Sequence, residues 1–321
     1  MLKNIFVGVD AGATKTRVIV VDDENNILGE ALGGPAVIRF NTDAAWQEIM
    51  LTLERALATM RPIETRSTET RSTETRSTET RLIASLHDSK YCFHAGMGIT
   101  GCEIKESYEK FINTPHIFKN LLVKQDSYTA CVGAHAGKDG AIVIIGTGVV
   151  GIALNDGEVT QVSGWGFPHD DKGSGAWFGL KAVSLTMQWY DGRFTTDSEL
   201  FQLVLQRFNH DFPKLVTWAN NARPTNFAEL APLVIHQAEK NDSVAIEIVK
   251  QAARHIDQVG LTLLKKAGGN TKLPCALFGG ISNMMKNYLS PEFKASLVQP
   301  KYDAAMGAVL ALKMQLKNIT H

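Results

Sequence analysis

Hydrophobic and polar residues alternate along this chain in a pattern that predicts two copies of one plan. In the first half, three alternating apolar runs predict a meander of three strands. Apolar residues at helical spacing then predict a helix with a cap within residues 41–43, and shorter strands and helices follow. The expected strands are 5–9, 16–21, 27–31, 91–95 and 120–124, and the expected helices are 41–60, 103–111 and one after residue 126.

The second half repeats this order of elements. A strand, a tight turn and a return strand lead to Asn155-Asp156-Gly157, a strong hairpin signal that introduces the third strand of a second meander. Helices then dominate, and two short strands and a last helix end the chain. The expected strands are 141–145, 151–154, 159–162, 276–278 and 297–299, and the expected helices include 241–266 and 304–314.

This repetition predicts an α/β protein of two domains that face each other across a cleft. We place the N-terminal α/β domain at residues 1–127, together with the C-terminal helix 304–318. The C-terminal α/β domain, with a helical insertion, is expected at residues 128–303. A duplication with the chemistry where the two copies meet explains the pattern better than two unrelated domains.

One segment, residues 64–81, fits neither copy. It cycles Glu-Thr-Arg-Ser-Thr with a period of five and contains no apolar residue. Such a segment cannot bury apolar surface to offset the entropy of ordering, so we expect a solvated loop or a frayed helical extension, with a charged interaction arm as the alternative. Deletion of residues 64–81 is therefore expected to leave turnover nearly intact, and a large loss of activity in the deleted protein would contradict this.

Composition limits the class of protein. The 321 residues carry 33 basic and 33 acidic side chains, so no net field favours nucleic acid or anionic lipid. No apolar run approaches the roughly 20 residues of a membrane span, and the N-terminus lacks the layout of a signal peptide. The four cysteines show no paired metal-ligand spacing. We therefore expect a cytoplasmic protein with reduced cysteines and no membrane or nucleic-acid partner.

The first predicted hairpin carries the most informative chemistry of the chain, in Asp10-Ala11-Gly12-Ala13-Thr14-Lys15-Thr16. Small residues such as Gly12 let backbone N–H groups approach a bound anion. The hydroxyls of Thr14 and Thr16 and the ammonium of Lys15 can bind phosphate oxygens, and Asp10 is placed to hold a divalent cation through water. This predicts a nucleotide site, and the alternative is an ordinary β-hairpin with a polar tip.

A second glycine motif supports a different class of enzyme. Residues 96–101 match the dinucleotide pattern GxGxxG between a predicted strand and a predicted helix, with Asp126 after the next strand. Residues 146–151 match the same pattern but lead into a strand, so they fail on context. An NAD-dependent oxidoreductase is therefore an alternative, although it leaves the hairpin at residues 10–16 unexplained.

Acidic and aromatic residues suggest a sugar as the second substrate. In the glycine-rich segment 164–179, Trp165 offers an aromatic face and Asp171 a carboxylate that accepts hydroxyl hydrogen bonds; a helix cap is the alternative role for Asp171. Asp126 follows what we take to be a central strand and can accept the proton of an attacking hydroxyl, or simply cap a helix. Gly279-Gly280 permits close stacking of a flat ring such as adenine, or forms a common turn.

Taken together, these motifs resemble the BadF/BadG/BcrA/BcrD ATPase and N-acetylglucosamine kinase family. The resemblance rests on Asp10-Ala11-Gly12-Ala13-Thr14-Lys15-Thr16, Gly146-Thr147-Gly148, Gly164-Trp165-Gly166, Asp171-Lys172-Gly173-Ser174-Gly175 and Gly279-Gly280. It implies the fold of actin, hexokinase and the heat-shock ATPases, with duplicated ribonuclease H-like domains. Within the family, the segments 125–135, 167–168 and 208–218 are most similar to bacterial glucosamine kinases.

The resemblance implies ATP and Mg²⁺ as cofactors and a homodimeric amino-sugar kinase. The first hairpin and the turn of Gly146, Thr147 and Gly148 would bind the phosphates, and Gly279-Gly280 the nucleoside. Asp126 would be the base on the sugar 6-hydroxyl, and Asp171 a sugar ligand. These roles predict phosphorylation of glucosamine at its 6-hydroxyl.

Four residues depart from the family pattern. Ala11 and Ala13 replace glycines, so the loop is stiffer, and Val149 replaces a serine that completes the second phosphate turn. Val150 stands where N-acetylglucosamine kinases often carry an asparagine that touches the sugar, which favours the free amine. An N-acetylglucosamine kinase stays the alternative. A sugar-independent ATPase subunit is a third reading, but such subunits hold an iron–sulfur cluster through paired cysteines that this chain lacks.

Overall fold

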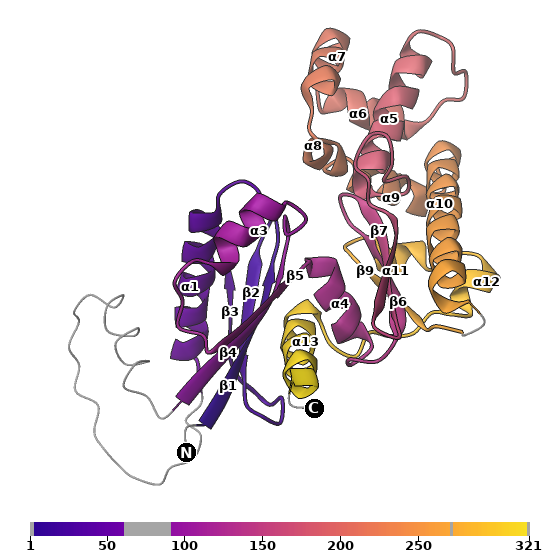
Figure 1. Cartoon of the computed structure of the whole chain (residues 1–321). Coiled ribbons are helices and arrows are strands. Elements are labelled where there is room, and N and C mark those ends of the chain that lie inside the picture. Colours follow the sequence, from indigo (N-terminus) through magenta and orange to yellow (C-terminus); the bar gives the residue numbers. More distant parts are fainter. Residues whose placement is uncertain (1–2, 61–90, 270–271, 320–321) are drawn as a thin grey trace. The chain divides into compact units, whose positions relative to one another are not determined.

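The structure is a computed structural model that describes residues 3–60, 91–269 and 272–319 (Figure 1). The repeat at 64–81 lies outside the described residues. The chain forms two compact units, each with its own core. The first unit comprises the residues up to Lys138 together with those from Lys301 onward, and the second runs from Asp139 to Pro300.

The first unit contains, among its described residues, a five-stranded sheet in the order β3-β2-β1-β4-β5. β1, β2 and β3 form the predicted antiparallel meander, whereas β4 and β5 run parallel to β1. The strands β1, β4 and β5 therefore end at the same edge of the sheet. The strands are β1 (Lys3–Ala11), β2 (Thr16–Val21), β3 (Ile27–Gly33), β4 (Tyr91–Ile99) and β5 (Asn120–Lys124).

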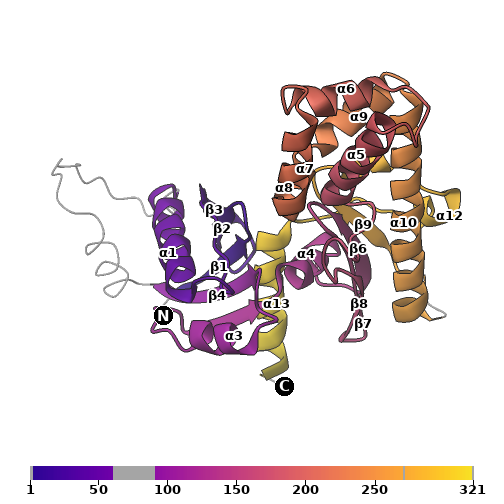
Figure 2. The ribbon, with the colours of Figure 1, turned by 90° about the horizontal axis from the view of Figure 1, so that it is seen from above.

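Helices cover both faces of this sheet (Figure 2). Alternate residues of β1, from Ile5 to Ala11, share a core with α1 and α3, while the opposite face carries α13 and α4. The side chain of Asn41 caps α1 by accepting a hydrogen bond from the N–H of Ala44 (3.0 Å), which confirms the predicted cap. The helices are α1 (Thr42–Ala58), α3 (Lys105–Ile112), α4 (Asp126–Ala134) and α13 (Ala304–Ile319).

Close helix packing explains the glycines of residues 96–101. Gly96 lies inside β4, and a Cβ there would overlap the carbonyl oxygen of Ala308 in α13. Gly98, also in β4, would place its Cβ on the hydroxyl of Thr129 in α4. A dinucleotide fingerprint needs these glycines in a turn that opens a helix. They serve strand–helix packing instead, so the structure does not support the NAD-dependent alternative.

The second unit contains, in its described part, a four-stranded sheet in the order β8-β7-β6-β9. β6, β7 and β8 form the second predicted meander, and β9 is parallel to β6. The predicted strand at 297–299 is wrong: Leu297 makes only an isolated bridge to Cys275, because the segment follows a helical turn directly and reaches Pro300, which has no N–H to donate. The strands are β6 (Gly140–Ile145), β7 (Val149–Asn155), β8 (Glu158–Ser163) and β9 (Cys275–Phe278).

Helices make up most of the second unit. The long helix α10 packs on β7 and β8 and is capped by Asp242, whose carboxylate accepts from the N–H groups of Val244 and Ala245 (both 3.0 Å). The helices are α5 (Gly175–Tyr190), α6 (Glu199–Gln206), α7 (Phe212–Asn221), α8 (Pro224–Ala228), α9 (Ala231–Glu239), α10 (Ser243–Gly268), α11 (Ser282–Met285) and α12 (Pro291–Lys294).

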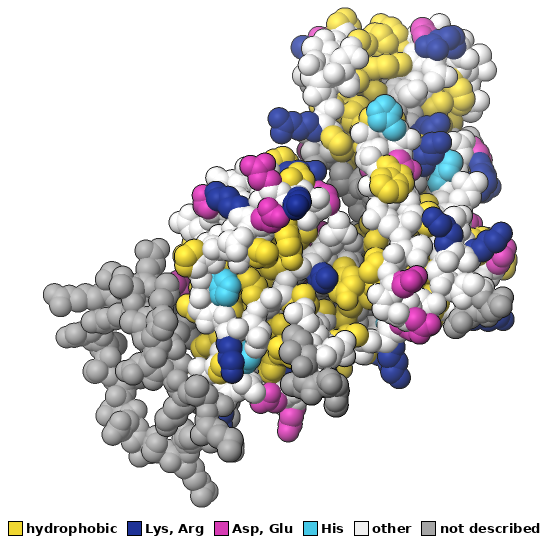
Figure 3. Space-filling model, viewed as in Figure 1, with side chains coloured by type: hydrophobic (Ala, Val, Ile, Leu, Met, Phe, Trp, Pro, Cys, Tyr) yellow, Lys and Arg dark blue, Asp and Glu magenta, His cyan; other side chains and the backbone are white. Residues whose placement is uncertain are grey.

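Charged side chains of both signs are interspersed on the face shown in Figure 3, in keeping with the balanced composition. None of the helices in the described residues is long and apolar enough to cross a membrane.

Candidate functional site

The shared edge of β1, β4 and β5 brings together the candidate residues of the first unit. Asp10 lies near the end of β1, and Thr100 follows β4. Asp126 is the first residue of α4, two positions after β5. β5, the strand before Asp126, is an outermost strand of the sheet and not a central one as predicted. Among the described residues, no further strand pairs with it beyond β4.

Two hydrogen bonds fix the carboxylate of Asp126. Its Oδ2 accepts from the Oγ1–H of Thr100 at 2.6 Å, and its Oδ1 accepts from the backbone N–H of Ser127 at 2.7 Å. The first turn of α4 adds a favourable dipole, because helix N-termini stabilise negative charge. Asp126 is therefore oriented as a hydrogen-bond acceptor at the edge of the sheet.

Asp10 is the most perturbed carboxyl group at this edge. Burial, and to a lesser extent the charge of Asp126, raise its pKa from 3.8 to about 6, although the charges of Lys15 and Arg17 oppose the shift. Two carboxylates that repel each other in a partly desolvated place would gain from a divalent cation between or beside them, and oxygen ligands suit Mg²⁺. The residues present therefore fit the implied Mg²⁺. Among the described residues, no group of three or more His, Cys, Asp or Glu side chains that could hold a metal is found.

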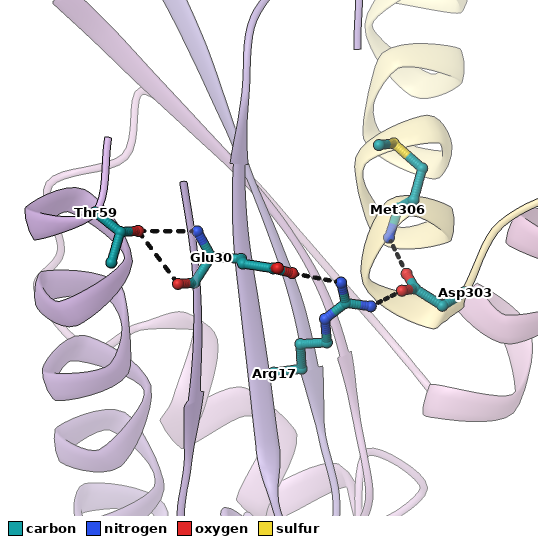
Figure 4. A network of polar contacts seen from close by, with 5 residues as sticks. All are labelled: Arg17, Glu30, Thr59, Asp303 and Met306. Atoms are coloured by element: carbon teal, nitrogen blue, oxygen red, sulfur yellow. Dashed lines mark hydrogen bonds and ion pairs between the residues drawn. The ribbon is translucent and has the colours of Figure 1, made fainter. Parts of the chain in front are cut away.

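Arg17 joins the hairpin to the start of α13 (Figure 4). Its guanidinium forms ion pairs with Glu30 of β3 (2.6 Å) and with Asp303, which precedes α13. Asp303 also accepts from the N–H of Met306 (2.9 Å) and so caps that helix. Because Arg17 is directly opposite Asp10 in the β1–β2 ladder, this network holds a positive charge beside the perturbed carboxyl group.

The turn between β1 and β2 exposes only part of its predicted phosphate ligands. Thr14 and Lys15 are exposed, and no atom lies closer than 3.8 Å to where a Cβ on Gly12 would be. The N–H of Gly12 is used within the turn, where it donates to the carbonyl of Lys15 (3.1 Å). Thr16 is fully buried, and its hydroxyl has no hydrogen-bond partner among the described residues.

The second unit places a comparable turn after β6. The N–H of Gly146 donates to the carbonyl of Gly148 (2.9 Å), and the carbonyls of Gly146 and Thr147 accept from the first N–H groups of α5, those of Gly175 (2.8 Å) and Ala176 (3.2 Å). No atom lies within 4 Å of where a Cβ on Gly146 would be. The turn is thus anchored to a helix N-terminus yet open on one side.

Asp171 is buried against this turn. Its Oδ1 accepts from the N–H of Val149 at 2.9 Å, and a Cβ on Gly148 would lie 2.9–3.0 Å from its carboxylate. Burial raises the pKa of Asp171, whereas the hydrogen bond from Val149 lowers it. Trp165 is 77% exposed, and its backbone N–H donates to Asp170 (3.1 Å).

Gly279 and Gly280 follow β9 and therefore reach the same edge as the turn after β6. Gly279 has a φ of 99°, and a Cβ on it would overlap the carbonyl of Ile145 at the end of β6. Gly280 has nothing within 4 Å of its Cβ position. The second unit thus gathers the predicted residues Gly146, Thr147, Gly148, Asp171, Gly279 and Gly280 at one edge of its sheet.

Sequence reasoning missed Thr100 and Arg17. Thr100 lies within residues 96–101, where the spacing of the glycines suggests a dinucleotide motif, and its contact with Asp126 joins residues 26 positions apart. Its place directly after a buried strand, at the edge that also carries Asp10, was the available signal.

The chain is similar in sequence to one ATPase family and to a sugar kinase. The profile of the BadF/BadG/BcrA/BcrD ATPase family matches residues 7–311. A glucosamine kinase from Vibrio cholerae, GspK, is 31% identical over 307 residues, which are 96% of this chain and 95% of the relative.

Solved structures agree with this class. A crystal structure described as a candidate N-acetylglucosamine kinase from Chromobacterium violaceum is 30% identical, with a TM-score of 0.79 and coverage of 97% of this chain and 100% of that one. A ROK hexokinase from Thermus thermophilus is similar in fold, with a TM-score of 0.52, 13% identity and coverage of 98% and 99%. The expected two-domain fold of the actin and hexokinase type is confirmed.

Proposed function

Because the chain belongs to the BadF/BadG/BcrA/BcrD ATPase family, we propose that it transfers the γ-phosphoryl group of ATP to the 6-hydroxyl of glucosamine. The observation that carries this proposal is the carboxylate of Asp126, which two donors hold at the sheet edge that also carries Asp10 and the first hairpin. The similarity to a glucosamine kinase over nearly the whole chain supports the choice of sugar.

In this proposal Asp126 accepts the proton of the sugar 6-hydroxyl as that oxygen attacks the γ-phosphorus. The exposed Thr14 and Lys15, and the open turn of Gly146, Thr147 and Gly148, bind phosphate oxygens. Asp10 would hold Mg²⁺ through water, and the ion, when bound, would neutralise charge on the phosphates. The other roles of this chain are orientation and electrostatic stabilisation, where most of the rate enhancement of phosphoryl transfer arises.

The sugar is recognised in this proposal by Asp126, Asp171 and Trp165. Trp165 offers an exposed aromatic face. The Oδ1 of Asp171 accepts from the N–H of Val149, and its Oδ2 would accept from a sugar hydroxyl. N-acetylglucosamine is the second candidate substrate, favoured by the 30% identical structure described as a candidate kinase for that sugar.

Measurement of ADP release with glucosamine, with N-acetylglucosamine and without sugar tests the proposal. We expect glucosamine to give the highest kcat/KM and a product phosphorylated at the 6-position. Faster turnover of N-acetylglucosamine would favour the second candidate, and hydrolysis unaffected by any sugar would exclude both.

Replacement of each glycine after β9 by alanine separates folding from nucleotide binding. Gly279→Ala is expected to lower the free energy of unfolding by roughly 2–4 kcal/mol, because its positive φ and the carbonyl of Ile145 leave no place for a Cβ. Gly280→Ala, which has open space, is expected to change stability by less than about 0.5 kcal/mol and to raise the KM for ATP. Denaturant unfolding and steady-state kinetics check both. Equal destabilisation of the two variants would contradict the packing argument, and an unchanged KM for ATP in Gly280→Ala would contradict the nucleoside site.

A further inference from the structure

Thr100 is held in place by its backbone on both sides. Its N–H donates to the carbonyl of Ala11 at the end of β1 (3.0 Å), and its carbonyl accepts from the N–H of Ile38 (3.3 Å). The residue is therefore fixed between the end of the first strand and the loop that leads to α1. It directly follows Ile99, the last residue of β4 that pairs with β1.

The hydroxyl of Thr100 lies between the first hairpin and Asp126. It donates to Asp126 Oδ2 at 2.6 Å, a short distance typical of a hydroxyl bound to a carboxylate. It is also 3.9 Å from where a Cβ on Gly12 would be, so it borders the hairpin as well. With Ser127 on Oδ1, each carboxylate oxygen of Asp126 has one donor, and the rotamer is determined from both sides.

This arrangement has a chemical purpose at a charged edge. Asp10 lies close enough to Asp126 for their charges to interact. Without hydrogen bonds to hold it, the carboxylate of Asp126 would tend to rotate away from Asp10. The thiol of Cys102 also feels the charge of Asp126, but it donates to the carbonyl of Ile99 (3.0 Å). A β-branched threonine has few χ1 rotamers, so its hydroxyl is a stiff donor.

We propose that Thr100 is a positioning residue that holds the carboxylate of Asp126 in line with the sugar hydroxyl from which it removes the proton. The inference rests on the proposed role of Asp126 as the general base. Thr100 itself accepts no proton from the substrate, because it acts only through the hydrogen bond to Oδ2.

Four variants test this proposal: Thr100→Val, Thr100→Ser, Asp126→Asn and the double variant Thr100→Val/Asp126→Asn. Loss of a hydrogen bond to a charged group predicts a fall in kcat of roughly 10–100-fold for Thr100→Val, with the KM for ATP changed by less than about threefold. Thr100→Ser keeps the donor and is expected to recover kcat to within about threefold of the native enzyme. In the Asp126→Asn background, Thr100→Val is expected to cost less than about threefold, because no base is left to position.

A control is Thr186→Val in α5, where the hydroxyl is more deeply buried than that of Thr100 and donates only to the carbonyl of Ala182 (2.7 Å). Its kcat is expected to stay at the native value. Melting curves establish that each variant is folded. If Thr100→Val is not folded, Thr100→Cys gives the same comparison with serine, because a thiol is a weak donor of similar size.

Native kcat in Thr100→Val would overturn the proposal, as would an equal loss in the native and Asp126→Asn backgrounds or an effect on KM alone. Failure of the proposed function gives a different result. Native protein without sugar-dependent ADP release removes the kinase and this inference together, whereas an impaired Asp126→Asn beside an unimpaired Thr100→Val removes the role of Thr100 alone.

Discussion

Replacement of Asp126 by asparagine is expected to lower turnover by roughly 10²–10⁴-fold, the usual cost of losing a general base. The amide keeps the size of the carboxylate: its oxygen can still accept from the N–H of Ser127, and its NH2 group can donate to the hydroxyl of Thr100, so the site is expected to keep its shape. What is lost is the ability to take the proton of the 6-hydroxyl. Steady-state kcat with glucosamine and ATP measures the effect, and nucleotide affinity is expected to change little.

Asp43→Asn is the matched control for this prediction. Asp43 also lies in the first turn of a helix, but it is exposed and pairs with Lys110 at 2.8 Å. The control removes the same charge from an equivalent helix position, so it accounts for the helix-dipole effect. A near-native rate in Asp126→Asn, or a comparable loss in Asp43→Asn, would remove Asp126 from the mechanism.

Replacement of Asp10 by asparagine is expected to make the protein more stable and less active. The pKa of Asp10 is raised from 3.8 to about 6, so the folded state binds a proton more tightly than the unfolded state does. The ionised group therefore destabilises the fold fully above about pH 6, and this cost disappears as the pH falls toward 4. We expect Asp10→Asn to gain about 2 kcal/mol at pH 7.5 in EDTA, with the gain shrinking at lower pH.

Denaturant unfolding from pH 4.5 to 7.5 measures this gain, and Asp22→Asn is a control of opposite sign. Burial raises the pKa of Asp22, but hydrogen bonds from Asn26 and Glu24 together outweigh it and lower the pKa overall, so removal of this carboxylate is expected to destabilise the protein at pH 7.5. The Asp10→Asn enzyme should also require roughly 10–100-fold more Mg²⁺, the usual cost of losing an outer ligand. Lower stability at pH 7.5 or an unchanged Mg²⁺ requirement would contradict the prediction.

The meanders could be predicted from the sequence because their signals are local. Alternating residues in β1 and β2, and the turn Asn155-Asp156-Gly157 between β7 and β8, each specify a hairpin through residues that are close in the sequence. The strand expected at 297–299 shows the limit of local signals. The segment Leu297-Val298-Gln299 has apolar residues that favour a strand, but it forms only one bridge, between Leu297 and Cys275. A strand also needs N–H groups in register with a neighbouring strand.

Candidate site residues can be selected from the sequence, but their contacts cannot. Asp10, Asp126 and the glycine turns are candidates by residue type and spacing, and their roles stay predictions. The contact of Asp171 with Val149 spans 22 residues, and Gly96 of β4 has its reason in α13, more than 200 residues later. Contacts between residues so far apart in the sequence depend on tertiary packing, which a single sequence does not reveal. Thr16 has the right type for a phosphate ligand, yet strand register turns its side chain into the core.

The return of α13 to the first unit also bears on how the protein is synthesised. β1 is synthesised before the second unit and α13 after it, so the face of β1 and β4 that lacks side chains at Gly8 and Gly96 cannot pack on Ala305 and Ala308 until the second unit has been translated. Arg17 likewise meets Asp303 only after that point. The second unit, whose residues are contiguous, has no such delay. The sheet whose strands lead to Asp10 and Asp126 is therefore begun before the second unit is translated and completed after it.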